Sequence, residues 1–269
     1  TTPDPMRPSP EERLLAWGAE PTGETWATPS SRLAAGVRDG VPVLVKVARI
    51  EEEVRGGRVL AWWSAHGGLP VLEHDADAVL MARATGTRDL VVWSTTGRDD
   101  DAVDVLVDTV LDLHAMPAPP DAVGLVPLRT WFADLLDRPQ PDPLLARLAA
   151  LAHDLLAGGG PAVALHGDVH HGNVLDLGDR WVAIDPKGLA GHPAFDLANL
   201  FCNPTQAVAV ARLEARLDRV AERAGLAREV LAGWIVAWCG LAVAWSRGVP
   251  DRHGRAAREV ATRLLPRAR

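Results

Sequence analysis

Two aspartates and one asparagine between residues 165 and 196 have the side chains and the spacing for phosphoryl transfer with magnesium. Asp168 and Asn173 reproduce the spacing D-x-x-x-x-N, and Asp185 ends the apolar segment that follows. In such a loop the aspartate handles the proton of the attacking hydroxyl. The asparagine and a later aspartate bind Mg²⁺, which prefers oxygen ligands. We therefore expect Asp168 to be the catalytic base, and Asn173 and Asp185 to be metal ligands.

Two short segments are expected to position these side chains. Residues 174–177 and 180–184 have the apolar pattern of strands and are joined by a Gly-Asp pair. A two-residue connection of this kind is typical of a β-hairpin. In that register, positions 173 and 185 meet at the open end of the hairpin, directly after the loop that carries the first aspartate.

Lysine is nearly absent from this chain. Of its 28 Lys and Arg residues, only Lys46 and Lys187 are lysines. The compact lysine charge and the planar arginine fork do not replace each other at a tight phosphate contact. Lys46 ends the strand-like segment 43–47, and a run of three glutamates ending at Glu53 opens the next helix. We expect Lys46 and Glu53 to form a kinase-type phosphate-binding ion pair, although a solvated helix start would also explain the glutamates.

The role of Lys187 stays open, since it could pair with an acidic loop residue or contact substrate or phosphate. The chain contains neither a Walker A sequence nor a G-x-G-x-x-G motif after a strand, which disfavours P-loop and Rossmann folds. The nearest candidate for a phosphate-covering loop is the segment Thr28–Arg32. There, Ser30 and Ser31 offer hydroxyl and backbone donors to the nucleotide.

A cluster of histidines at His166, His170 and His171 suggests zinc as an alternative. A pair at i and i+4 faces one metal only on a helix, and this segment leads into strands. No cysteine lies nearby, and no glutamate lies between the histidines. We expect them to brace the loop by hydrogen bonds or to border the substrate. A zinc hydrolase, which would contain stoichiometric zinc, is the rival.

The composition is that of a soluble globular protein, with 48% hydrophobic and 23% charged residues among 269. No apolar run approaches the ~20 residues of a membrane span, and residues 1–12 lack the apolar core of a signal peptide. A cytoplasmic, monomeric protein without a membrane partner is expected. The net charge of −7 disfavours nucleic acid and suits a cationic small molecule. Cys202 and Cys239 lack a CxxC spacing and are expected to be reduced and buried.

The periodicity predicts an α+β fold with a small β-rich lobe, residues 1–83, and a larger, mainly helical lobe, residues 84–269. The tryptophan stripe from Trp234 to Trp245 is expected in the core, and Asp196 is expected to cap a helix. Strands are expected near 25–28, 32–38, 41–47, 69–73 and 78–82. Helices are expected at 11–17, 51–66, 100–114, 127–136, 143–157, 196–202, 205–225, 228–247 and 251–265.

With these residues in place, the chain resembles the aminoglycoside phosphotransferase family, a small-molecule branch of the protein-kinase fold. The resemblance rests on Leu165–Val174 and Ile184–Gly191 and is closest to the streptomycin 6-phosphotransferases, which are grouped with aminoglycoside and hydroxyurea kinases. It covers nearly the whole chain, with weaker support from Glu53–Gly56, Val59–Trp62, Leu113–His114 and Leu241–Trp245. His171 departs from many relatives, which have proline there.

The resemblance implies a two-lobed kinase fold, ATP and Mg²⁺ as cofactors, and the residue roles given above. It also implies that Val79–Arg83, including Met81 and Arg83, binds adenine through its backbone. The implied reaction is phosphorylation of a cationic aminocyclitol, namely streptomycin at its 6-hydroxyl, in antibiotic resistance. A metabolic kinase of a sugar, amino sugar or choline-like alcohol is one alternative, and a catalytically silent kinase-fold binding protein is another. Substrate-binding residues do not transfer by motif.

Overall fold

The computed structural model describes residues 8–246 and 252–268. The N-terminal arm before residue 8 and the join between the last two predicted helices lie outside these residues. The contacts divide the chain into two compact units. The first unit runs up to Thr87 and also takes Pro119–Gly124 and Leu175–Lys187, and the second takes the rest. The predicted boundary at residue 83 stays a prediction.

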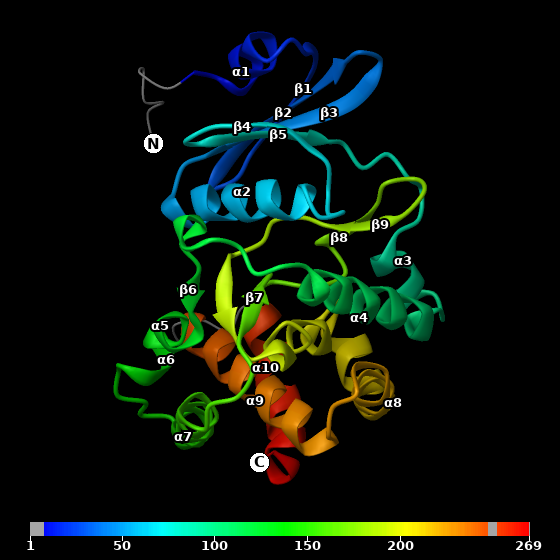
Figure 1. Ribbon diagram of the computed structural model, residues 1–269. Coiled ribbons are helices and arrows are strands. Elements are labelled where there is room, and N and C mark those ends of the chain that lie inside the picture. The colour runs from blue at the N-terminus through cyan, green and yellow to red at the C-terminus, as the bar shows by residue number, and fades with distance from the viewer. Residues whose placement is uncertain (1–7, 247–251, 269) are drawn as a thin grey trace. The chain divides into compact units, whose positions relative to one another are not determined.

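The first unit is built on an antiparallel five-stranded sheet with the order β1-β2-β3-β5-β4 (Figure 1). Helix α1 contacts β1, β2 and β3, and helix α2 contacts β3, β4 and β5. The elements are α1 (Pro10–Ala16), β1 (Glu20–Ala27), β2 (Ser31–Arg38), β3 (Val41–Ala48), α2 (Glu51–Ser64), β4 (Val71–His74) and β5 (Ala78–Ala82).

The alternation of side chains along β3 decides which residues reach the core and which reach a cavity. Val43, Val45 and Val47 share one face, are at most 1% exposed, and pack with Leu14 of α1. Because successive strand residues point to opposite faces, Lys46 projects from the other face, which α2 covers.

The second unit is mostly helical, and its core helix is α9 (Arg228–Trp245), which contacts α7, α8 and α10. Among the described residues, α9 is long and apolar enough to cross a membrane, contrary to our expectation, but 67% of it is buried. That burial identifies it as a core helix. The other helices are α3 (Leu90–Thr95), α4 (Asp99–Ala115), α5 (Leu128–Trp131), α6 (Ala133–Leu136), α7 (Pro143–Ala157), α8 (Gln206–Ala224) and α10 (Arg252–Leu264).

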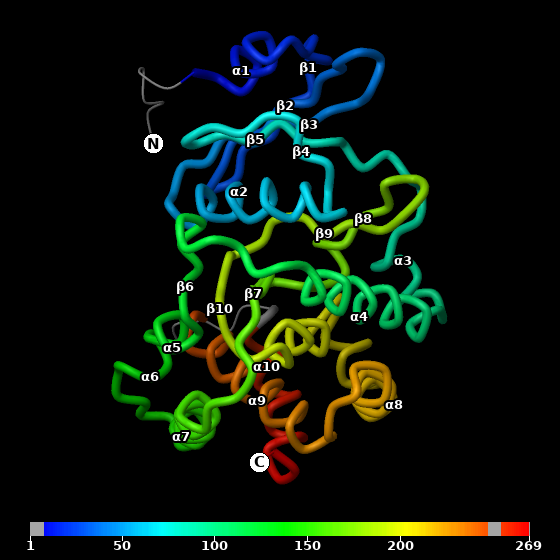
Figure 2. Tube along the Cα trace, in the orientation of Figure 1, coloured from blue at the N-terminus to red at the C-terminus, as the bar shows by residue number. Residues whose placement is uncertain are grey.

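Helices α4 and α8 lie side by side (Figure 2) and are joined by a ladder of Asp–Arg ion pairs. At its first rung Arg216 is 1% exposed and donates to Asp99 over 2.6 and 3.0 Å. Further along, Arg219 and Arg223 form two-bond pairs with aspartates of α4. Asp99, the first residue of α4, is therefore largely buried against α8.

Short strands complete the chain: β6 (Val126–Pro127), β7 (Val163–Leu165) and β10 (Leu189–Gly191) form one sheet, and β8 (Val174–Asp176) and β9 (Trp181–Ala183) form another. The second confirms the predicted hairpin, with the Leu177 N–H donating to the Arg180 carbonyl over 2.8 Å. The helix predicted at 196–202 is instead 3₁₀ structure, η2 (Pro193–Phe195) and η3 (Asn199–Cys202).

Candidate functional site

In the first unit, Lys46 lies between two carboxylates. Its Nζ forms ion pairs with Glu53 of α2 and with Asp185, which follows β9. The side chains of Lys46 and Glu53 are 13% and 6% exposed, so both charges are largely desolvated. A buried charge is tolerated where opposite charges pair with it. The arrangement holds a lysine ammonium and an aspartate carboxylate next to each other.

Helix α2 also contacts the segment that carries Asp185. Glu52 lies 3.1 Å from the Nζ of Lys187, and Arg55 donates through Nε to the Lys187 carbonyl over 2.8 Å. A Cβ at Gly56 would come within 2.5 Å of the Pro186 carbonyl oxygen, so this close approach requires glycine. The glycine in the middle of helix α2 is therefore explained by packing.

Lys46, Glu53 and Asp185 line a cavity of about 380 Å³ in the first unit. Its volume lies within the range of small-molecule sites. Asp185 and Lys187 line it together with every residue predicted to bind the nucleotide, namely Ser30, Ser31, Lys46, Glu53, Met81 and Arg83.

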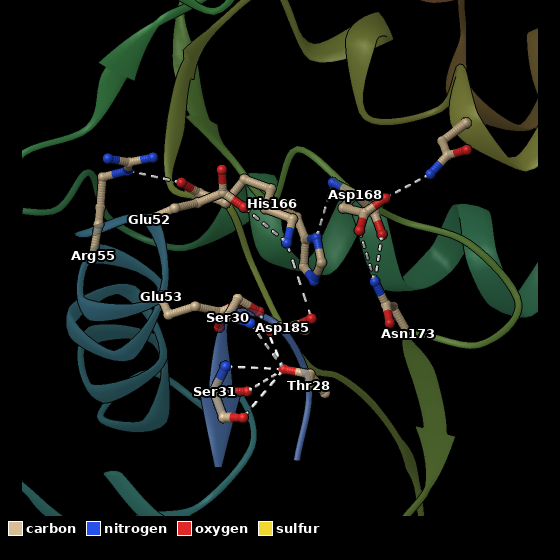
Figure 3. Close-up of polar contacts among 12 residues, drawn as sticks. Thr28, Ser30, Ser31, Glu52, Glu53, Arg55, His166, Asp168, Asn173 and Asp185 are labelled. Atoms are coloured by element: carbon tan, nitrogen blue, oxygen red, sulfur yellow. Dashed lines mark hydrogen bonds and ion pairs between the residues drawn. The ribbon is translucent and has the colours of Figure 1, made fainter. Parts of the chain in front are cut away.

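The loop between β1 and β2 is closed by its own hydrogen bonds (Figure 3). The Oγ1 of Thr28 accepts from the Ser31 N–H over 2.9 Å and from the Ser30 N–H over 3.3 Å. Both serine hydroxyls also lie within 3.2 Å of this Oγ1. The backbone donors that the sequence offered to phosphate are thus engaged inside the loop.

The segment predicted to bind adenine is likewise occupied by sheet contacts. The Ala82 N–H donates to the Pro70 carbonyl over 2.8 Å, and the Arg83 N–H donates to the Pro42 carbonyl over 3.1 Å. The Arg83 guanidinium pairs with Glu24 over 2.7 Å. The backbone N–H groups of Ala82 and Arg83 are therefore engaged within the first unit.

In the second unit, the Asp168 carboxylate receives donors from two asparagines (Figure 3). Asn173 Nδ2 lies 3.2 Å from Oδ2 and 3.0 Å from the Asp168 carbonyl oxygen. Asn199 Nδ2 lies 2.7 Å from Oδ1. A carboxylate that accepts a hydrogen bond on each of its two oxygens has a fixed orientation.

The loop that carries Asp168 is anchored by the buried carboxylate of Asp196, which is 1% exposed. It accepts from the backbone N–H groups of His166 over 2.9 Å and Gly167 over 2.7 Å. It also lies 2.9 Å from Nε2 of His114. Asp196 therefore does not cap a helix N-terminus, as its place in the sequence suggested, but fixes this loop.

Comparison with known proteins decides the family. Residues 16–249 match the family model described as aminoglycoside/hydroxyurea antibiotic resistance kinase. The chain belongs to this family. A streptomycin 3″-kinase of Klebsiella pneumoniae is 43% identical over 242 residues, covering 86% of this chain and 90% of that protein. A streptomycin 6-kinase of Streptomyces griseus is 31% identical over 215 residues, covering 74% and 69%.

Solved structures confirm the kinase-like fold. An aminoglycoside phosphotransferase in ternary complex with ADP and hygromycin B aligns with a TM-score of 0.65 at 13% identity, covering 95% of this kinase and 97% of that chain. A choline/ethanolamine kinase family protein from Mesorhizobium loti aligns with a TM-score of 0.59 at 15% identity, covering 91% and 88%. The fold is thus α+β, and the family match identifies the chain as a phosphotransferase with an alcohol acceptor.

Some polar residues of this kinase have roles that the sequence did not indicate. Asn199 was given no role from the sequence, and His114 belonged only to the family likeness. Lys187 was noticed but not assigned, and the structure places it beside Glu52 and within 4.0 Å of Asp185. For all of them the missing information was which distant segment lies opposite.

The histidines do not form a metal site: among the described residues, no group of three His, Cys, Asp or Glu side chains could hold a metal. His166 and His170 brace the loop as expected, because each Nδ1 accepts from a backbone N–H two residues later. His171 is 2% exposed, and neither ring nitrogen has a hydrogen-bond partner. Burial, with Arg216 nearby, lowers its pKa to about 3.

This buried histidine is expected to make the kinase sensitive to acid. Below its ordinary pKa of 6.5 the unfolded chain binds a proton at His171, whereas the folded kinase does not until about pH 3. The free energy of unfolding should therefore fall as the pH drops through this window, by up to about 1.4 kcal/mol per unit. Urea unfolding of wild type and His171→Leu at pH 7.5, 6.0 and 5.0 measures this change in the free energy of unfolding.

The variant should show a shallower pH dependence than wild type. His153→Leu is the control, because that side chain is 65% exposed on α7. Equal slopes for His171→Leu and wild type would contradict the expectation.

Proposed function

We propose that this kinase transfers the γ-phosphate of ATP to a hydroxyl of streptomycin and requires Mg²⁺. The observation that carries the proposal is the 43% identity to a streptomycin 3″-kinase over 90% of that protein's length. The 6-kinases of two Streptomyces species, at 31% and 30% identity, support the same acceptor. A net charge of −7 suits a cationic acceptor.

We favour the 3″-hydroxyl as the position, in place of the 6-hydroxyl that the family resemblance implied. The relative that acts at 3″ is more similar to this chain, and the match covers more of its length, than either 6-kinase. The hydroxyl that is phosphorylated must therefore be determined from the chemical structure of the product.

The nucleotide is proposed to bind in the cavity of the first unit. Solved relatives in complex with ADP and with AMP-PNP support an adenine nucleotide. Lys46, held by Glu53, is proposed to bind the phosphates as a point charge. Ser30 and Ser31 would border them with their hydroxyls, and the segment from Met81 to Arg83 would border the adenine.

The oxygen donors present fit Mg²⁺, which is held by few protein ligands and by substrate phosphates. The Asp185 carboxylate is one-third exposed and lines the cavity. Asn173 directs its nitrogen at Asp168, which leaves its side-chain oxygen for a cation. We propose these two residues as ligands. When bound, the ion would neutralise charge on the transferred phosphoryl group.

Asp168 is proposed to accept the proton of the acceptor hydroxyl. The hydroxyl oxygen forms the new bond to γ-phosphorus while the bond from phosphorus to the bridging oxygen breaks. ADP leaves, and the proton passes to the carboxylate. The fixed orientation of this carboxylate by Asn173 and Asn199 supports the assignment.

The test is a product-identified kinase assay with ATP, Mg²⁺ and a panel of streptomycin, hygromycin B, hydroxyurea, glucosamine and choline. We expect ADP release and a phosphorylated product with streptomycin, and phosphorus–proton NMR correlation to the 3″ position. A product only with glucosamine or choline would replace the proposal by a metabolic kinase. Thermal stabilisation by Mg·ATP without product from the whole panel would favour a silent binding protein.

A further inference from the structure

Asn199 donates a hydrogen bond to the carboxylate that we propose as the base. Its Nδ2 lies 2.7 Å from Asp168 Oδ1, and its side chain, in η3, is 3% exposed. The other carboxylate oxygen receives Asn173 Nδ2 over 3.2 Å. The two oxygens are thus held from two separate segments of the second unit.

The side chain of Asn199 is itself held in place by Asn203. Asn203 Nδ2 donates to its side-chain oxygen over 2.8 Å and to its backbone carbonyl over 3.0 Å. An amide whose oxygen already accepts must present its nitrogen to the other side, here to Asp168. Arg216 then donates to the carbonyls of Leu200 over 2.7 Å and Asn203 over 2.6 Å.

The same guanidinium is paired with Asp99 of α4. A chain of buried and partly buried hydrogen bonds therefore runs from the α4–α8 ladder through Arg216, Asn203 and Asn199 to the carboxylate of Asp168. Such a network is rigid when every member is satisfied.

We propose that Asn199 is a positioning residue for phosphoryl transfer. It sets the plane of the Asp168 carboxylate, so that a lone pair stays directed at the acceptor hydroxyl. Asn173 reaches only Oδ2, over 3.2 Å, whereas Asn199 holds the other oxygen, Oδ1, by the shorter contact of 2.7 Å. Asn199 acts only through Asp168, so the proposal rests on the proposed role of that base.

The test compares Asn199→Ala and the isosteric Asn199→Asp with wild type, using streptomycin and Mg·ATP. Loss of a hydrogen bond to a charged group predicts a fall in kcat of about 10- to 100-fold, with both KM values changed less than about threefold. Cys202→Ala, in the same 3₁₀ segment and facing Cys239, is the matched control and should keep its kcat.

A double-mutant cycle separates positioning from a general structural role. In an Asp168→Ala background, Asn199→Ala should cost less than about twofold more, because its target is gone. Equal losses in both backgrounds, or wild-type kcat in both Asn199 variants with cooperative thermal melts, would overturn the proposal. If Asp168→Ala alone kept wild-type turnover, the base assignment itself would be wrong. Asn199→Ser replaces any variant that fails to fold.

Discussion

Asp168→Asn is expected to lower kcat with streptomycin by about 10²–10⁴-fold, the usual contribution of general acid–base catalysis. The substitution keeps the shape of the side chain but removes its capacity to accept a proton. Asp168 accepts hydrogen bonds from Asn173 and Asn199. An amide at this position has one oxygen that accepts and one nitrogen that donates, so it cannot accept both bonds in the same way. Steady-state kinetics with coupled detection of ADP measures the loss.

The control for this variant is Asp154→Asn, because that side chain is 83% exposed on α7. It should retain the kcat of wild type. An Asp168→Asn enzyme with turnover close to wild type and an unchanged thermal midpoint would contradict the assignment of the base.

Asp185→Ala is expected to reduce turnover by about 10³-fold or more, because a metal ligand contributes several kcal/mol to the transition state. Lys46 retains its pair with Glu53 in this variant, so the fold of the first unit should persist. The measurement is kcat as a function of Mg²⁺ concentration, with circular dichroism to confirm folding.

Asp179→Asn, in the turn of the β8–β9 hairpin and 73% exposed, is the matched control. Near-normal turnover of Asp185→Ala at the Mg²⁺ concentration that saturates wild type would refute the metal assignment.

Local patterns predicted the elements whose signals are complete within a few residues. The strand at 78–82 and the helix at 143–157 have the predicted bounds. Between the predicted strands 32–38 and 41–47, Asp39 and Gly40 both have positive φ, 52° and 77°, as a two-residue hairpin turn requires. Amphipathic periodicity and turn chemistry were sufficient there.

Elements that depend on distant partners were not predicted from the sequence. The strands β6, β7 and β10 are two or three residues long and exist only because they pair with one another across the sequence. Helix α3, residues Leu90–Thr95, was also not predicted; it is only six residues long, although the Asp89 side chain caps it locally. Helix 127–136 breaks at Phe132 into α5 and α6.

The same distinction applies to the candidate site. The spacing of Asp168 and Asn173 lies in one short motif and could be recognised directly. The contact of Asn199 with Asp168 joins residues 31 apart, and that of Arg216 with Asp99 joins residues 117 apart. No local pattern encodes such contacts, because they follow from the packing of whole helices.

The scarcity of lysine gains a practical meaning from where the two lysines lie. Lys46 and Lys187 are the chain's only lysines and line the same cavity. Every other basic side chain that can pair with a carboxylate is arginine or histidine. An amine-selective reagent therefore has two side-chain targets in the molecule, both in the cavity proposed for the nucleotide. Both lysines of the protein therefore lie where the nucleotide is proposed to bind.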